Sequence, residues 1–412
     1  MGGTFPKDFL WGTATAAHQV EGGNTASDLW LMEWMKDSLF EEPSADACDH
    51  YHLYERDIAL LKGLGFNTYR FSIEWARIEP VEGFFSQAAL DHYRRMIAFC
   101  LSIGVAPMVT FHHFTAPLWF TRDGGWENAA SVDRFARYCE KAAAALGDLI
   151  PYICTINEAN IPIMVTMMRQ AVGIAGGGGK RERALAEAAR LCGGEVGKFS
   201  PYLSGDGIAS APNLIAAHRK GYDIIKGLSD AAVGITVALN NFQCEEGGEQ
   251  LFKTADHAIN GQFLETLKGD DFVGVQTYTR VRFGAKGVLP PPEGAERTQM
   301  GYEFYPESLE ATIRQAAKES GCPVIVTENG IGTEDDTRRI AYTTRALEGV
   351  LRCIADGIDV GGYIHWSMLD NFEWLEGYRP KFGLIEVDRT TQARKPKPSA
   401  YWLGGVAKGN GL

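Results

Sequence analysis

Residues 49–73 read DHYHLYERDIALLKGLGFNTYRFSI, a helical pattern followed within a few residues by a strand pattern. The apolar residues of its first part recur at the spacing of one helix face: Tyr51, Tyr54, Ile58 and Leu61. Gly63 and Gly65 predict the end of this helix. The following segment, residues 67–73, is rich in aromatic and β-branched residues and predicts a buried strand. A strand that alternates with helices in this way is typical of a parallel sheet with crossover helices.

The same unit recurs along the chain. Ser86 predicts the start of a second helix and Gly104 its end, and Ser131 predicts the cap of a third. The buried stripe expected on that third helix is Phe135, Cys139, Ala142 and Leu146. We expect eight strands, at residues 9–14, 67–73, 105–111, 153–156, 233–239, 272–277, 324–327 and 362–366. The pattern predicts an α/β fold, a single (β/α)₈ TIM barrel over residues 1–412 with extended βα loops.

Composition excludes several classes of protein. Hydrophobic residues make up 45% of the chain and charged residues 22%, which are the values of a globular protein. The net charge of −12 repels phosphate backbones and anionic lipids, so we expect neither a nucleic acid nor a membrane as partner. The N-terminal segment lacks the pattern of a secretory signal, and the eight cysteines are scattered without a C-x-x-C pair. These features predict a cytoplasmic protein.

Chemistry in a (β/α)₈ barrel belongs where strands end and βα loops begin. Two carboxylates, Glu158 and Glu328, follow the fourth and seventh predicted strands. Arg70 lies near the end of the second strand, and Tyr278 follows the sixth. Cleavage of a glycosidic bond with retention requires two carboxylates about 5 to 5.5 Å apart, one as acid/base and one as nucleophile. The pattern therefore indicates a retaining glycosidase.

Two short motifs resemble those of glycoside hydrolase family 1, the β-glucosidase family. TINEAN (155–160) resembles its acid/base motif, and VTENG (326–330) resembles its nucleophile motif. Further similar segments follow in the family's order over nearly the whole chain: FLWGTATAAHQVEG (9–22), DHYHLYERDI (49–58), YRFSIEWARIEP (69–80), WSMLDNFEWLEGY (366–378) and KFGLIEVD (381–388). The resemblance implies a (β/α)₈ barrel that is a retaining exo-β-glycosidase, forms a covalent glycosyl-enzyme intermediate and needs no cofactor.

The resemblance also implies a role for each site residue. Glu328 would be the nucleophile and Glu158 the acid/base. We expect Arg70 and Tyr278 to keep Glu328 ionised, and we expect the negative charge of Glu328 to raise the pKa of Glu158. Asn157 precedes the acid/base in the motif. The remaining residues implied to hold the sugar are Gln19, His113, Trp366, Glu373, Trp374 and Phe382.

Glu373 bears on the substrate. Family members that act on 6-phosphorylated sugars usually lack this glutamate, and a carboxylate here would repel a phosphate. We therefore expect unphosphorylated terminal β-D-glucosyl groups as substrate, with β-galactosyl and β-fucosyl groups as further candidates. The chain departs from the family pattern at three positions near the site: Phe114 stands where Trp is usual, Ala159 where Pro is usual, and Gln276 where Asn is usual.

Other interpretations stay open. A transglycosylase would use the same residues, and a sugar-binding protein with little turnover would keep the pocket. His112 beside His113 would suggest zinc only with a third ligand, and the sequence places none, so no metal site is predicted. The tract Gly176–Gly179 lacks the flanking residues of a phosphate loop, and we expect a hinge there. The oligomeric state is not predicted.

Overall fold

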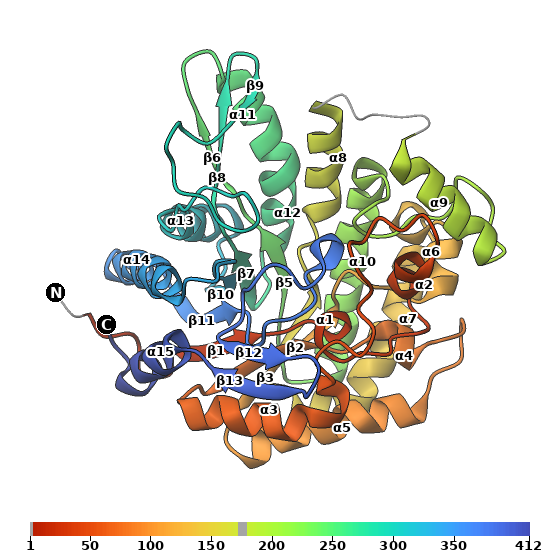
Figure 1. The fold of residues 1–412 in the computed structure, drawn as a ribbon, viewed down its shortest axis with the longest axis horizontal. Helices are drawn as coiled ribbons and strands as arrows, with labels where there is room; N and C mark the ends of the chain where they lie inside the picture. The colour runs from red at the N-terminus through yellow and green to blue at the C-terminus, as the bar shows by residue number, and fades with distance from the viewer. Residues whose placement is uncertain (1–2, 172–178) are drawn as a thin grey trace.

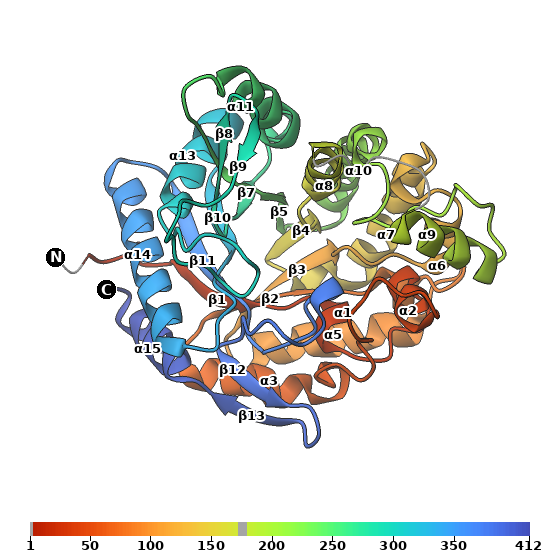
Figure 2. The same cartoon turned by 45° about the horizontal axis from the view of Figure 1, so that its top comes forward.

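The computed structural model describes residues 3–171 and 179–412. Within them, eight parallel strands close into a barrel in the order β1-β11-β10-β7-β5-β4-β3-β2 (Figures 1 and 2). The barrel strands are β1 (Leu10–Ala14), β2 (Thr68–Ser72), β3 (Ala106–His112), β4 (Tyr152–Ile156), β5 (Ala232–Ala238), β7 (Phe272–Gln276), β10 (Val324–Asn329) and β11 (Val360–Trp366). The predicted (β/α)₈ barrel is confirmed, and each expected strand is present within two residues of its predicted bounds.

Helices form the outer layer, as Figure 2 shows around the ring of strands. The main outer helices are α3 (His50–Leu64), α5 (Gln87–Ser102), α7 (Ser131–Leu146), α10 (Gly207–Leu228), α13 (Ser308–Ser320), α14 (Asp336–Ala355) and α15 (Pro398–Gly409). The expected stripe of α7 is buried. The barrel strands are buried almost throughout, because helices cover the outside of the sheet and side chains fill its interior.

The helix ends test the predicted signals. Gly65 ends α3 with a φ of 119°, and a Cβ added there would lie 2.7 Å from the carbonyl oxygen of Gly404. Ser86 caps α5 by accepting a hydrogen bond from the backbone N–H of Ala89 at 3.3 Å. The cap predicted at Ser131 is wrong, because Ser131 is already the first helical residue of α7. The side chain of Asn128 accepts from the backbone N–H of Ala130 at 3.0 Å, in the turn before the helix, and α7 has no side-chain cap.

Additional elements lie in the loops between strands and helices. Two small sheets stand outside the barrel, one of β6 (Asn241–Cys244), β8 (Arg280–Gly284) and β9 (Gly287–Leu289), the other of β12 (Ile385–Asp388) and β13 (Ala393–Pro396). Short helices are α1 (Ala17–Val20), α2 (Asp28–Trp34), α4 (Trp75–Ile78), α6 (Leu118–Arg122), α8 (Ile161–Ala171), α9 (Lys180–Leu191), α11 (Glu249–Asp256), α12 (Gln262–Leu264) and the 3₁₀ turn η5 (Trp374–Glu376). Of the expected glycine hinge, residues 176–178 lie outside the described residues. No described helix is long and apolar enough to cross a membrane.

Candidate active site

Strand β10 brings the carboxylate of Glu328 to the end of the barrel, where three donors hold it. Arg70, buried in β2, donates from Nη1 to Oε1 at 2.6 Å. The hydroxyl of Tyr278 donates to Oε2 at 2.6 Å. The amide nitrogen of Gln276, at the end of β7, donates to Oε1 at 2.9 Å. Both oxygens of Glu328 therefore have fixed partners before any ligand binds.

Glu158 lies in the turn that follows β4, and its backbone rather than its carboxylate is held. Its φ is +45°, a left-handed value that costs a residue with a side chain about 1 kcal/mol or more. The backbone N–H of Glu158 donates to Oγ1 of Thr236 at 3.0 Å, and the hydroxyl of Tyr202 donates to its carbonyl oxygen at 3.1 Å. The carboxylate accepts no hydrogen bond from any residue within the described ranges. The strained turn thus presents an unpartnered carboxyl group to the cavity.

The pKa values of the two carboxyl groups follow from these surroundings. Burial raises the pKa of Glu328, and the charge of Arg70 and the hydrogen bond from Tyr278 oppose that rise without reversing it. We expected Arg70 and Tyr278 to keep Glu328 ionised, and they act in that direction, but burial prevails in the net shift. Burial and then the charge of Glu328 raise the pKa of Glu158 well above its usual range. A proton shared by this pair therefore resides on Glu158.

Asn157, next to Glu158 in the chain, contacts residues that several neighbouring strands contribute to the site. Its Oδ1 accepts hydrogen bonds from Arg70, from Gln276 at 2.9 Å and from the hydroxyl of Thr236 at 3.1 Å. Its amide nitrogen then donates to Nε2 of His113 at 3.1 Å. Burial and the charge of Arg70 lower the pKa of His113, so its ring is neutral and carries its proton on Nδ1. That Nδ1 is buried and has no partner among the described residues.

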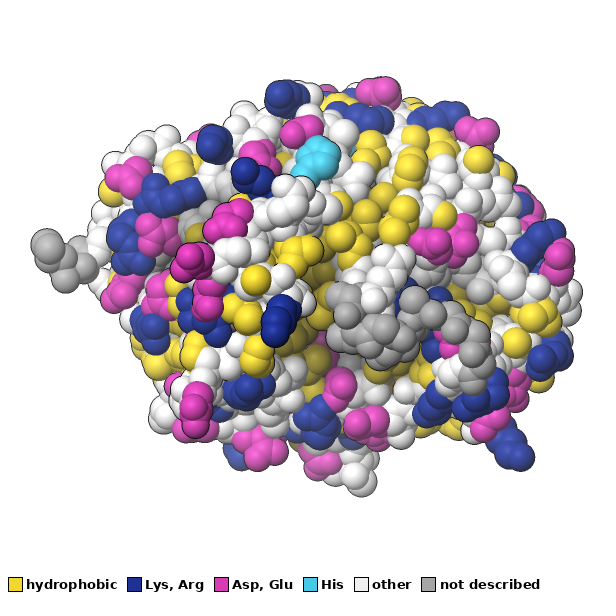
Figure 3. All heavy atoms as spheres, turned by 90° about the horizontal axis from the view of Figure 1, so that it is seen from above, with side chains coloured by type: hydrophobic (Ala, Val, Ile, Leu, Met, Phe, Trp, Pro, Cys, Tyr) yellow, Lys and Arg dark blue, Asp and Glu magenta, His cyan; other side chains and the backbone are white. Residues whose placement is uncertain are grey.

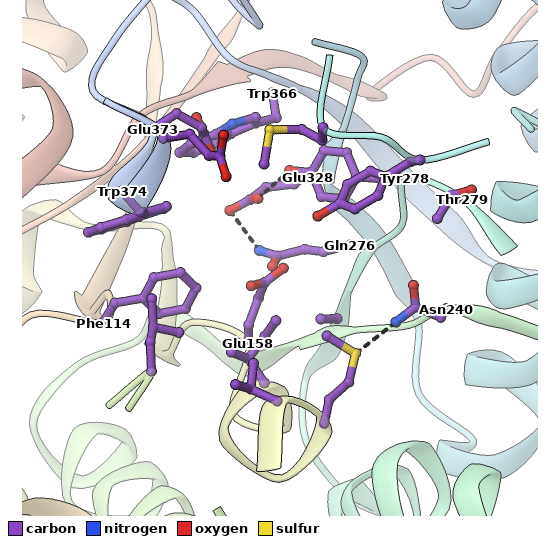
Figure 4. A pocket seen from close by; sticks show the side chains of 18 of the residues that line it. Phe114, Glu158, Asn240, Gln276, Tyr278, Thr279, Glu328, Trp366, Glu373 and Trp374 are labelled. Carbon is purple, nitrogen blue, oxygen red and sulfur yellow. Dashed lines mark hydrogen bonds between the residues drawn. The ribbon is translucent and has the colours of Figure 1, made fainter. Parts of the chain in front are cut away.

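A cavity of about 390 Å³ opens beside the two carboxylates. Figure 4 shows Glu158 and Glu328 directed into it, with the amide of Gln276 between them. Five of the predicted sugar-binding residues line the cavity: His113, Trp366, Glu373, Trp374 and Phe382. Burial and the charge of Glu328 raise the pKa of Glu373 to about 8. The size is that of a small-molecule site.

Three predicted residues do not line the cavity but support residues that do. Arg70 and Asn157 lie behind Glu328 and His113. The amide nitrogen of Gln19, in α1, donates to the carbonyl oxygen of Phe372 at 2.6 Å and lies 3.4 Å from Oε2 of Glu373. The amide oxygen of Gln19 is buried without a partner among the described residues.

Aromatic rings pack around Trp374 beside the cavity. His18 stacks on Trp374 with ring centres 6.0 Å apart and an angle of 6° between planes. Phe114, where the family pattern has Trp, lies 5.0 Å from Trp374 and also lines the cavity. Figure 4 shows these two rings side by side. Phe114 thus keeps an apolar face toward the cavity but offers no N–H donor.

Sequence reasoning missed several residues of the site. Thr236 and Tyr202 fix the turn at Glu158, yet both are distant from it along the chain. The one sequence signal for Thr236 was the presence of a threonine within the apolar segment AVGITVA (232–238). Apolar residues from α8 and two loops also line the cavity, and no motif marked them.

Comparison with known proteins supports a single family. The family model for glycosyl hydrolase family 1 matches residues 1–187 and 268–412. β-Glucosidase A of Acetivibrio thermocellus is 32% identical over 469 aligned positions, covering 99% of each chain. A bifunctional β-D-glucosidase/β-D-fucosidase of Bifidobacterium breve is 32% identical and covers 97% of each chain. The crystal structure of β-glycosidase BGL167 superposes with a TM-score of 0.93 at 51% identity, covering 98% of this chain and 97% of that one. The chain belongs to glycosyl hydrolase family 1.

Proposed function

We propose that this protein is a retaining β-glucosidase in which Glu328 is the nucleophile and Glu158 the acid/base. The observation that carries the assignment is the contrast between the two carboxylates in one cavity. Glu328 is fixed by Arg70, Gln276 and Tyr278, whereas Glu158 has no side-chain partner among the described residues and the higher tendency to hold a proton. A nucleophile needs a fixed, charged oxygen, and an acid/base needs a carboxyl group that can gain and lose its proton.

The reaction then runs in two displacements. In the first, an oxygen of Glu328 bonds to the anomeric carbon while the bond from that carbon to the aglycone oxygen breaks. Glu158 gives its proton to the departing oxygen, so the aglycone leaves as a neutral alcohol. In the second, Glu158 takes a proton from water as the water oxygen bonds to the anomeric carbon and the ester to Glu328 breaks. The sugar leaves with its original configuration.

The sugar end of the cavity supports an unphosphorylated sugar. The carboxyl group of Glu373 supplies a hydrogen-bonding partner for sugar hydroxyls, and the indole of Trp366 offers an apolar face to a pyranose ring. No Lys or Arg is found among the described residues that line the cavity, whereas three glutamates besides Glu376 are. Binding of a phosphate dianion in this cavity would be unfavourable, because no residue in this set would neutralise its charge.

Glucose is the favoured glycone, with fucose and galactose as secondary ones. The Acetivibrio relative is named a β-glucosidase, and the Bifidobacterium relative is named for both glucosidase and fucosidase activity.

We place the protein in the cytoplasm as part of the same proposal. Its eight cysteines are all free thiols, six of them buried, which is consistent with a reducing compartment.

The test is hydrolysis of nitrophenyl β-glucoside with the first-formed anomer followed by NMR. We expect turnover that releases β-glucose before mutarotation, and its loss in Glu328→Ala. Glu348→Ala is the matched control, because Glu348 is an exposed carboxylate on α14, outside the cavity. α-Glucose as the first product would contradict the retaining mechanism, and a folded chain without turnover would contradict the enzyme assignment.

A further inference from the structure

The cavity changes character from its deep end to its mouth. The deep end holds Glu158, Gln276 and Glu328, all nearly buried. The mouth is bordered by an outer wall of six residues: Ile161, Met164 and Met168 from α8, Met300 and Tyr302 from the loop before α13, and Leu375 from η5. Met168 is 56% exposed, Leu375 44% and Tyr302 40%. Large apolar side chains thus stay in contact with water at the entrance.

The surface view agrees with this description. Figure 3 looks onto the face that carries α8 and shows hydrophobic side chains gathered near its centre, with many charged side chains toward its edge. Exposed apolar side chains that border a cavity and are rimmed by charge are typical of a binding surface. The outer wall lies where the aglycone of a bound glycoside would extend.

Three of the polar groups near the outer wall are already engaged. The amide nitrogen of Asn240 contacts the sulfur of Met164 at 2.9 Å (Figure 4). The hydroxyl of Thr279 donates to the carbonyl oxygen of Glu303 at 2.9 Å. Glu376 forms an ion pair with Arg379. A second sugar placed here would lose water from its hydroxyls and regain few hydrogen bonds, whereas an apolar group would gain from every contact.

We infer that the aglycone of the natural substrate is an apolar alcohol or phenol rather than a second sugar. This inference rests on the proposed β-glucosidase function and names its substrate class. The three methionines of the outer wall are flexible and polarizable, so they fit ring-shaped apolar groups of differing outline. The protein therefore takes glucose from apolar glucosides in preference to shortening glucose oligomers.

The test compares cyclohexyl β-glucoside with cellobiose. Both place a six-membered ring in the aglycone position, one apolar and one hydroxylated. The sugar hydroxyl is the better leaving group, so chemistry alone favours cellobiose. We expect kcat/KM for the cyclohexyl substrate to exceed that for cellobiose by about tenfold or more, the effect of burying about two methylene groups. Equal or higher kcat/KM for cellobiose would overturn the inference.

Variants assign the preference to the outer wall. Met164→Gln and Met168→Gln keep the side-chain length and add an amide, so each should lower the cyclohexyl-to-cellobiose ratio by about threefold or more. Leu228→Gln, at an exposed apolar residue at the end of α10, is the control and should leave the ratio unchanged. A ratio that both methionine variants leave unchanged would overturn the assignment. Failure to hydrolyse any β-glucoside, nitrophenyl β-glucoside included, would instead refute the proposed function.

Discussion

Glu328, on strand β10, and Glu158, in the turn after β4, face one cavity, yet the protein surrounds them differently. Glu328 accepts hydrogen bonds from Arg70, Gln276 and Tyr278. Glu158 accepts none from the described side chains, and its backbone is held in a left-handed turn instead. This difference shows that position in the cavity alone does not distinguish the proposed nucleophile, Glu328, from the proposed acid/base, Glu158. Donors stabilise the charged form of Glu328 against the effect of burial, and their absence leaves Glu158 free to carry the proton.

Removing Glu328 should have the largest effect. In Glu328→Ala no oxygen remains to form the covalent intermediate, so kcat should fall by about 10⁵-fold, the scale expected for loss of a nucleophile. The loss should be similar for substrates with good and poor leaving groups. Steady-state rates with nitrophenyl and methyl β-glucoside check this, and a loss confined to the poor leaving group would give Glu328 the acid role instead.

Removing Glu158 should produce an effect that depends on the leaving group. In Glu158→Ala, kcat/KM for methyl β-glucoside should fall by about 10² to 10⁴-fold, because the departing oxygen receives no proton. For dinitrophenyl β-glucoside, whose leaving group needs no proton, kcat/KM should change by far less. Circular dichroism of the variant controls for folding. Equal losses with both substrates would contradict the acid/base assignment.

Removing the amide of Gln276 should shift a pH profile. The amide stabilises the charged form of Glu328, so Gln276→Met should raise the pKa of Glu328 further. The acidic limb of kcat/KM, which requires ionised Glu328, should move to higher pH by about one unit. Gln276→Asn, the residue usual in the family, is the comparison variant. An acidic limb unmoved by Gln276→Met would mean that the amide does not support the charge of Glu328.

The coupling between the carboxylates predicts a smaller change. The charge of Glu328 is the second cause, after burial, of the raised pKa of Glu158. Glu328→Gln removes that charge, so the pKa of Glu158 should fall while staying above its usual value because burial persists. Carbon-13 NMR titration of labelled glutamate, with Glu158→Gln to assign the signal, measures it. A pKa that stays the same or rises would show that the two groups are not coupled.

Much of the fold was predictable from local patterns. The eight barrel strands are short apolar segments between helices with clear glycine ends, and Gly65 ends α3 as predicted. The sequence could not show that Ser131 lies inside α7, because serine is also favoured at the cap position. The strands β6, β8 and β9 were missed because they are short and lie outside the barrel, β6 in the loop after β5 and the other two in the loop after β7. That residues 1–412 form one domain stays a prediction.

The candidate site was predictable where motifs marked it. Glu158, Glu328, Arg70 and Tyr278 converge as expected. The three contacts of Asn157 Oδ1 explain why an amide precedes Glu158. Thr236 and the outer wall were not predictable, because their roles arise from contacts between residues distant in sequence. The sequence also did not show which groups Gln276 would contact in place of the usual Asn. Its amide nitrogen donates to Glu328 and Asn157, and not to the carboxylate of Glu158.

Azide rescue of the two alanine variants tests the contrast between Glu328 and Glu158 most directly. Azide added to Glu328→Ala should attack from the vacated nucleophile side and give α-glucosyl azide. In Glu158→Ala the covalent intermediate still forms, so azide should attack from the opposite face and give β-glucosyl azide. NMR of the products distinguishes the two anomers. The account predicts opposite anomers from the two variants, and the same anomer from both, or the reverse assignment, would contradict it.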